Sequence, residues 1–164
     1  MKNKKKDHLP VYGVGPVCVY LMVVLLIIGI VLKYLGYLDS GDAGVFRIPM
    51  YLIGVALIVF GVYMWIHAVI IEKVGDDILQ NHLATTGMYA LVRNPIYTAI
   101  AMALTGIVFL LTNFWLLILP VLFWLDITLF MKFTEEKWLL GLYGDEYREY
   151  CKKVNRCIPW FPRK

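Results

Sequence analysis

Apolar residues are gathered along this chain into four long blocks, with short polar stretches between them. The blocks are residues 11–32, 48–71, 96–111 and 114–131. Their apolar positions show neither strand alternation nor a single helical stripe, and a run of about 18 apolar residues is typical of a helix that crosses a membrane. The pattern therefore predicts an all-α integral membrane protein with four transmembrane helices.

The last two blocks are joined only by Thr112 and Asn113, which predicts a tight antiparallel helix hairpin. Block 96–111 is short: at 1.5 Å per residue it spans about 24 Å, less than the roughly 30 Å hydrocarbon core. Asn94 is the predicted N-cap of this helix and Pro95 its first residue. Because a helix end recessed in the membrane requires a polar cavity, we expect a site here.

Polar residues dominate the chain after residue 131. Helical character continues over 132–140, Gly141 and Gly144 are expected to break it, and Asp145 is expected to cap an amphipathic stretch over 146–154. We interpret this part as a cytoplasmic helical cap. The predicted organisation is a basic N-terminus at 1–10, two transmembrane helices within 11–71, and a catalytic region at 72–164.

Composition and charge narrow the class of protein. Residues of apolar type make up 60% of the chain and charged residues 17%, against about a quarter in soluble domains, which excludes a soluble or disordered protein. Three cysteines without a Cys-x-x-Cys pair predict neither a disulfide framework nor a metal site. Block 11–32 is longer than a signal-peptide core, and we interpret it as an anchor that stays.

The basic residues predict the orientation in the membrane. Four Lys or Arg residues precede the first block, two lie between the second and third blocks, and eight follow the fourth. The positive-inside rule then places both termini in the cytoplasm, with the protein in the plasma membrane. The net charge of +4 follows from this bias, so it does not indicate a nucleic-acid partner. The expected partners are the lipid bilayer and an amphiphilic substrate.

Three charged residues at the cytoplasmic ends of the hairpin are candidates for a binding site. Arg93 is either a connector residue that reaches toward lipid headgroups or, ahead of a helix N-terminus, a ligand for a carboxylate. Glu135 and Glu136 follow the fourth block, and Glu136 has the spacing to pair with Lys132 and Lys137 on the surface. If the hairpin brings Arg93 and Glu135 together, they would suit a zwitterionic amino acid group.

Asp126 is an ionisable residue inside the fourth block. Such residues are costly in a membrane and indicate a function by default. Asp126 is also near enough to the helix end to reach water or a partner without taking part in catalysis.

At these residues the sequence resembles the isoprenylcysteine carboxyl methyltransferase family and its relatives, the phospholipid N-methyltransferases. The resemblance covers roughly the C-terminal half of the chain. It is carried by residues 83–97, Glu135-Glu136-x-x-Leu139, Tyr143-Gly144-Asp145-Glu146-Tyr147-x-x-Tyr150 and Val154-x-Arg156-x-x-Pro159. Asn94 stands where the family typically has His.

The resemblance implies a methyltransferase that uses S-adenosylmethionine. By similarity, the residues around the cofactor are Asn81, His82, Leu83, Ala84, Tyr89, Asn94, Pro95, Ile96 and Tyr97, with Glu135 at its amino acid end. We add Arg93 from its charge and position, for the cofactor carboxylate or for ordering the loop. The segment that carries Arg156 is expected to fold over the site as a lid.

The acceptor stays open: a lipid-like or other hydrophobic molecule that offers a carboxyl or an amine. A carboxylate acceptor needs no base, whereas an amine must lose a proton. The catalytic candidates are therefore Arg93, Tyr97, Glu136 and Asp126. In prenylcysteine enzymes an Arg precedes the matching Glu by four residues, and here Met131 stands at that position, beside Lys132.

Two other functions fit part of the pattern. Sterol-reductase-like membrane enzymes that depend on NADPH share an Arg-x-Pro-x-Tyr element and a Tyr-Cys segment similar to Tyr150-Cys151, but the doubled glutamate argues against them. The other alternative is a non-catalytic small membrane protein.

Overall fold

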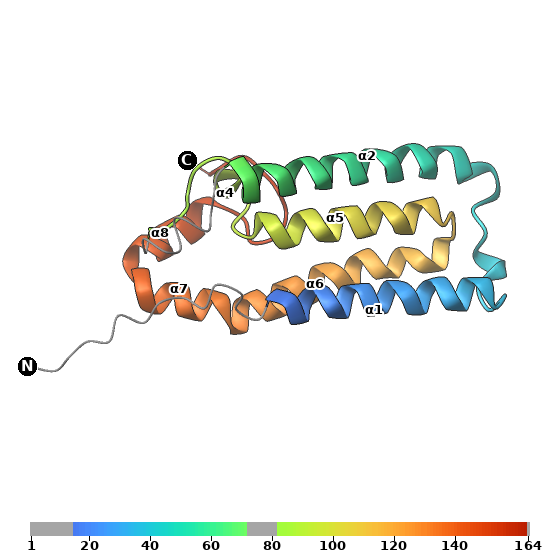
Figure 1. The fold of residues 1–164 in the computed structure, drawn as a ribbon, viewed down its shortest axis with the longest axis horizontal. Helices are drawn as coiled ribbons and strands as arrows, with labels where there is room; N and C mark the ends of the chain where they lie inside the picture. The colour runs from blue at the N-terminus through green and yellow to red at the C-terminus, as the bar shows by residue number, and fades with distance from the viewer. Residues whose placement is uncertain (1–14, 72–81, 164) are drawn as a thin grey trace, which may run out of the picture.

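The structure is a computed structural model, and it describes residues 15–71 and 82–163. Regular structure in these two ranges is helical throughout, without a strand, which confirms the all-α prediction (Figure 1). The helices are α1 (Gly15–Tyr34), α2 (Arg47–Ile66), α4 (Met88–Leu91), α5 (Pro95–Leu110), α6 (Ile118–Phe133), α7 (Glu135–Tyr143) and α8 (Asp145–Lys153). The predicted basic N-terminus at 1–10 lies outside the described residues.

Three helical segments are long and apolar enough to cross a membrane. They are Gly15–Tyr34, Gly44–Ile71 and Phe114–Tyr143. The second includes a π-helical turn at His67–Ile71, and the third includes a 3-10 turn at Phe114–Leu117. The fourth predicted span corresponds to α5, which is apolar but has only 16 residues.

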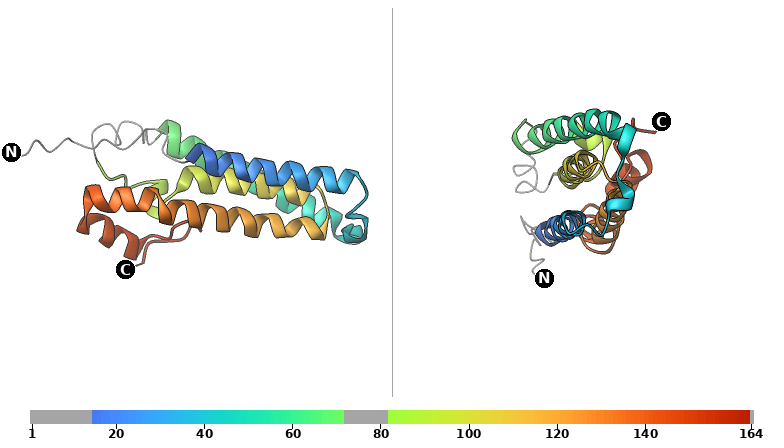
Figure 2. Two further views of the ribbon diagram at one scale, coloured as in Figure 1. Left: turned by 90° about the horizontal axis from the view of Figure 1, so that it is seen from below. Right: turned by 90° about the vertical axis from the view of Figure 1, so that its right-hand side faces the viewer.

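The four long helices lie side by side, and the smaller helices gather at one end of them (Figure 1). Helices α5 and α6 run antiparallel, and α2 packs on the side of α5 that faces away from α6 (Figure 2). In the turn between α5 and α6, the Asn113 side chain accepts a hydrogen bond from the Trp115 N–H and donates one to the Leu38 carbonyl. The turn is thereby fixed to the connection that follows α1.

Helices α2 and α5 approach each other until their backbones touch. A Cβ on Gly106 would lie 2.6 Å from the carbonyl oxygen of Gly54, and one on Gly54 would lie 2.8 Å from that of Gly106. At Gly61 the nearest atom would be the carbonyl oxygen of Ala99, at 2.7 Å. Small residues at such crossings are what allows membrane helices to pack by van der Waals contact.

Replacing Gly106 with valine should lower the free energy of unfolding by about 1–3 kcal/mol, because backbone atoms cannot move aside as a side chain can. Thermal unfolding in detergent, followed by circular dichroism, measures the change. Gly141→Ala is the matched control, because a Cβ there meets no atom within 4 Å. The free energy of unfolding of this variant should rise by about 0.5–1 kcal/mol, since alanine is favoured over glycine within a helix. Equal stability of the Gly106→Val variant and the parent would contradict the close approach.

Two details of the C-terminal part differ from the sequence-based expectation. Gly141 lies within α7 and does not break it, because an exposed glycine with open space around it is tolerated in a helix. The N-cap of α8 is Gly144, with φ of 57°, and Asp145 is the first residue of the helix. Glycine adopts this backbone conformation without strain, so it takes the junction between α7 and α8.

Candidate functional site

The chain after α8 crosses over the start of α5. We call residues 154–163 the strap. Four hydrogen bonds attach it to residues 91–98: Arg93 N–H to Asn155 O, Asn94 Nδ2 to Arg156 O, Thr98 Oγ1 to Cys157 O, and Trp160 N–H to Leu91 O. Their lengths are 2.9, 3.1, 3.2 and 3.0 Å in that order. Residues 155–160 of the strap are therefore bound to the end of α4, the loop before α5 and the first turn of α5.

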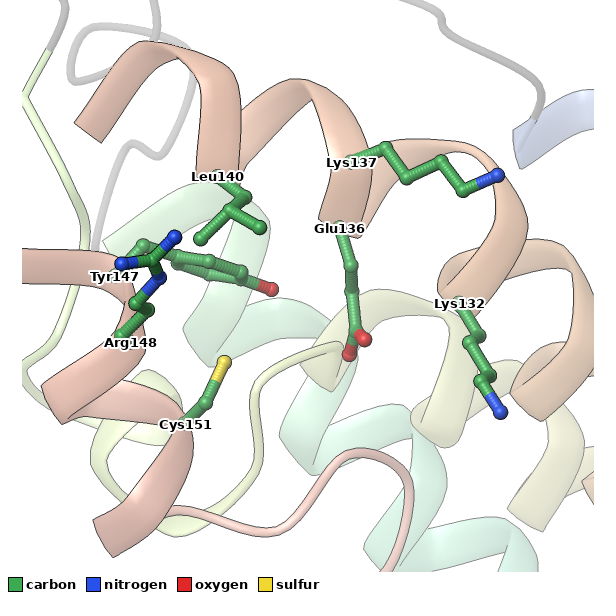
Figure 3. A pocket seen from close by; sticks show the side chains of 7 residues that line it. All are labelled: Lys132, Glu136, Lys137, Leu140, Tyr147, Arg148 and Cys151. Carbon is green, nitrogen blue, oxygen red and sulfur yellow. The ribbon is translucent and has the colours of Figure 1, made fainter. Parts of the chain in front are cut away.

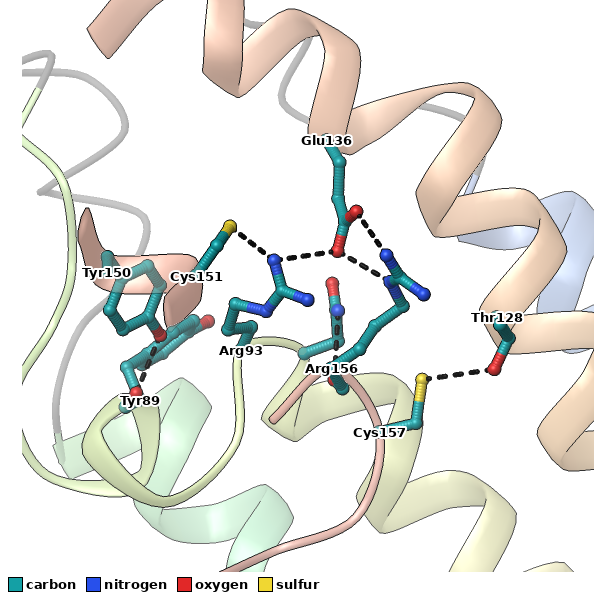
Figure 4. Close-up of polar contacts among 9 residues, drawn as sticks. Tyr89, Arg93, Thr128, Glu136, Tyr150, Cys151, Arg156 and Cys157 are labelled. Atoms are coloured by element: carbon teal, nitrogen blue, oxygen red, sulfur yellow. Dashed lines mark hydrogen bonds and ion pairs between the residues drawn. The ribbon is translucent and has the colours of Figure 1, made fainter. Parts of the chain in front are cut away.

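Glu136 binds two arginines that come from different segments (Figure 4). Its carboxylate accepts from Arg156 Nε at 2.7 Å and Nη2 at 2.8 Å, and it lies 3.1 Å from Arg93 Nη1. The exposed fractions of the Glu136, Arg93 and Arg156 side chains are 13%, 9% and 27%. We call these three residues the ion triad. It joins the start of α7, the loop before α5 and the strap.

Two neighbours complete the surroundings of the ion triad. Arg93 Nη1 also donates to the sulfur of Cys151, and Arg93 Nε is buried with no partner among the described residues. The bidentate bond to Glu136 raises the pKa of Arg156, so the cluster keeps two positive charges for one negative. Burial raises the pKa of the thiol of Cys157, a residue of the strap, which keeps it protonated.

The expected surface pairs of Glu136 with Lys132 and Lys137 are wrong. The carboxylate points across to the loop before α5, whereas the two lysine ammonium groups lie over the ring of Phe133, at 5.7 and 5.4 Å from its centroid. The four-residue spacing to Lys132 made a surface pair possible, but two largely buried guanidinium groups offer charge-assisted hydrogen bonds away from water.

Glu135 has a partner of its own. The hydroxyl of Tyr97 donates to Glu135 Oε1 at 2.9 Å, and both side chains are half-buried. The juxtaposition of Arg93 with Glu135 is not what the structure has, since Arg93 pairs with Glu136. Successive residues of a helix point about 100° apart, so the two glutamates at the start of α7 serve different neighbours.

Asn94 and Pro95 occupy the predicted positions at the start of α5. Asn94 is the N-cap residue and Pro95 the first helical residue, but the Asn94 side chain does not cap the helix. The Asn94 amide donates to the Arg156 carbonyl instead. Asn94 and Pro95 are both buried. Ile96 follows and is half-buried. The sequence thus predicted the helix start correctly and the use of the Asn94 side chain wrongly.

The other expected cofactor residues lie in and around α4. His82 is exposed, and Leu83 and Ala84 are half-buried. The carbonyl of Tyr89 accepts a hydrogen bond of 2.6 Å from the hydroxyl of Tyr150 in α8. Asn81 lies outside the described residues.

Asp126 lies apart from the ion triad, on the side of α6 that faces α1. It is 7% exposed, and its Oδ2 accepts a hydrogen bond of 3.0 Å from the thiol of Cys18. Its Oδ1 is buried without a partner among the described residues. A buried oxygen without a hydrogen bond lowers the stability of the fold, so its presence at Asp126 indicates a role other than stability.

A hollow of about 290 Å³ opens between α7 and α8, beside the ion triad (Figure 3). Glu136 and Lys132 lie on one side of it, and Tyr147 and Cys151 lie on the other. Burial, helped by the charge of Glu136, raises the pKa of Tyr147, so its hydroxyl remains a hydrogen-bond donor. The sequence did not identify Cys151 as a partner of Arg93. The only available signal was its position directly after Tyr150 in the C-terminal motif.

Parts of the chain are similar in sequence to known proteins. The family model described as phospholipid methyltransferase matches residues 17–146. The protein-S-isoprenylcysteine O-methyltransferase of Schizosaccharomyces pombe is 39% identical over 83 residues, which is 49% of this chain and 34% of that relative. The match therefore spans about a third of the length of the curated relative. No solved structure matches the chain.

Proposed function

The chain belongs to the phospholipid methyltransferase family, and we propose that it transfers a methyl group from S-adenosylmethionine to a lipid-like or other hydrophobic acceptor at the cytoplasmic face of the membrane. The observation that carries the proposal is that two adjacent carboxylates, Glu135 and Glu136, have different partners. Glu136 is engaged by two arginines, while Glu135 offers an oxygen, Oε2, that has no hydrogen bond to the described residues. Glu135 is thus available to a ligand.

Glu135 suits the cationic amino group of the cofactor. It is half-buried at the N-terminus of α7, next to the Tyr97 hydroxyl, and a carboxylate in such a place forms charge-assisted bonds to an ammonium. We assign residues 81–84, Tyr89 and residues 94–97 to the remainder of the cofactor site, as the family resemblance implies. The cofactor supplies a methyl group on a sulfonium, whose sulfur keeps the electron pair of the broken bond.

Arg93 is better suited to ordering the loop than to binding a carboxylate. Its guanidinium already contacts Glu136 and Cys151, and its N–H holds the strap. For the same reason we remove Glu136 from the candidates for a general base, because both of its oxygens are already bound by the two arginines.

The contribution that remains for the protein is orientation and exclusion of water, since in-line displacement at a sulfonium needs little covalent help. A carboxylate acceptor reacts without a base. An amine acceptor must give up a proton, and Asp126 is then the candidate, because its Oδ1 is buried without a partner in the described part of the chain.

A groove on the apolar side of the hairpin supports a hydrophobic acceptor. It holds about 210 Å³ between α5 and α6, where Met102, Trp124 and Ile127 contribute to its lining. Ile158 of the strap also lines the groove, two residues from Arg156 of the ion triad. We propose that α5 spans the membrane with the other three segments, in the plasma membrane with both termini cytoplasmic, so that the acceptor approaches from the lipid.

The test uses the purified protein in detergent. S-adenosylhomocysteine should raise its melting temperature, since a ligand at 100 times its Kd adds about 2.7 kcal/mol to the free energy of unfolding. Incubation with methyl-labelled cofactor and a total lipid extract should then label a lipid, which mass spectrometry identifies. Stabilisation by NADPH alone would favour the reductase alternative, and no response to either ligand would favour a non-catalytic membrane protein.

A further inference from the structure

The first residue of α1 touches the Tyr97–Glu135 pair. A Cβ at Gly15 would overlap the hydroxyl oxygen of Tyr97 and lie 2.5 and 2.6 Å from its Cζ and Cε1. Gly15 is buried, so the Tyr97 ring end fills the space where a side chain would otherwise be. Helix α1 is thus in contact with the hydroxyl that donates to Glu135.

We propose that Gly15 is a positioning residue for the cofactor site: the absence of a side chain there lets the Tyr97 hydroxyl lie against α1 and hold Glu135 Oε1. This inference rests on the proposed function, in which Glu135 binds the amino group of the cofactor. The motifs that carry the resemblance lie in the C-terminal half, and the match to the family model begins at residue 17, after Gly15. The assignment of Gly15 therefore comes from the contact alone.

The hydrogen bond from Tyr97 fixes one oxygen of Glu135 and leaves the other for the ligand. A carboxylate at the end of a long side chain otherwise has several rotamers, and ordering it costs free energy at the moment of binding. A group that holds the carboxylate beforehand removes that cost, as outer-shell partners do for other charged ligands.

Cys18 sets the rotation of α1 that brings Gly15 to Tyr97. Residues three apart in a helix lie on the same face, and Cys18 donates to Asp126 Oδ2 on α6 at 3.0 Å. In a membrane, a hydrogen bond between helices of this kind fixes how one helix is turned against the other. Gly15 is therefore held against α5 while Cys18 is held against α6.

The contact at Gly15 differs from the other close glycine contacts. At Gly54 and Gly106 an added Cβ meets a backbone oxygen, which cannot move without separating the helices. At Gly15 the three nearest atoms all belong to the far end of the Tyr97 side chain. Added bulk there should displace the tyrosine hydroxyl from Glu135 and leave the helices in place.

Gly29 provides a matched control in the same helix. A Cβ at Gly29 would lie 2.9 Å from Leu119 Cδ1 and 3.0 Å from Leu116 Cδ2, which are also ends of side chains. Gly29→Ala therefore also crowds α1 against the ends of side chains, though less tightly than Gly15→Ala does. Its partners are apolar and lie about 20 Å along the helix from Gly15.

The experiment measures the Kd for S-adenosylhomocysteine and the melting temperature of purified variants in detergent. We expect Gly15→Ala and Tyr97→Phe each to weaken binding by about tenfold, the equivalent of one charge-assisted hydrogen bond. Gly29→Ala should bind as the parent does. The double variant Gly15→Ala/Tyr97→Phe should bind no more weakly than Tyr97→Phe, because both changes remove the same hydrogen bond.

Each failure points to a different conclusion. If Glu135→Ala loses affinity while Gly15→Ala keeps it, the inference is overturned and the proposed function stands. Unchanged affinity of Tyr97→Phe also overturns it, and this variant answers the question even if Gly15→Ala does not fold, since it leaves α1 untouched. Absence of binding by the parent protein overturns the proposed function instead.

Discussion

Replacing Glu136 with glutamine should lower the free energy of unfolding by about 3–5 kcal/mol, which makes it the most destabilising single change that we expect in this protein. Glutamine keeps the shape of the side chain but removes the charge that Arg93 and Arg156 share. Two largely buried guanidinium groups, 9% and 27% exposed, would then face each other without a counter-charge. Thermal and denaturant unfolding in detergent, followed by circular dichroism, measure the loss.

A pair of similar length on the surface is the control. Lys152 lies 2.6 Å from Glu149 on α8, but the two side chains are 70% and 62% exposed. Glu149→Gln should therefore change the free energy of unfolding by no more than about 1 kcal/mol. If both variants lost the same small amount, the ion triad would be a surface feature and would not hold the strap to α7.

The sequence was sufficient to predict the long helices because their signal is local. Block 96–111 corresponds to α5 at Pro95–Leu110, and block 48–71 ends where the π-helical turn ends, at Ile71. Length and uniform apolar character determine such helices without reference to the rest of the molecule. Pro95 at the first helical position marked the start of α5 for the same local reason.

The partners of the charged residues were beyond the reach of sequence reasoning. The local sequence offered Lys132, at the end of α6, and Lys137, in α7, as partners for Glu136. Only the path of the strap brings Arg156 to it, from 20 residues away. Likewise, the predicted hairpin placed Arg93 near the two glutamates but did not show which of them it would contact. The choice depends on the rotation of α7 about its axis, which tertiary contacts determine.

The two adjacent glutamates have different contacts. Glu136 joins three segments by charge, and this fixes the start of α7 and with it the direction of Glu135. Glu135 has one oxygen bound to Tyr97, and in the proposed function its other oxygen binds the amino group of the cofactor. A helix turns consecutive residues toward different neighbours, which allows two adjacent carboxylates to have different contacts.

Replacing Glu135 with glutamine should weaken the binding of S-adenosylhomocysteine by about 10- to 150-fold, since a hydrogen bond to a charged group is worth about 1.5–3 kcal/mol and each 1.4 kcal/mol is tenfold. The fold should persist, because the amide oxygen of glutamine still accepts the Tyr97 hydroxyl. Isothermal titration measures the affinity, and label transfer to lipid should fall at subsaturating cofactor.

Glu146→Gln is the matched control, since Glu146 is also in the first turn of its helix, α8, but is exposed. It loses the same charge and should keep the affinity of the parent protein. The melting temperature of the Glu135 variant without ligand separates a binding defect from unfolding. An affinity for S-adenosylhomocysteine equal to that of the parent would exclude Glu135 from the cofactor site, because no other change in the variant compensates for the lost charge.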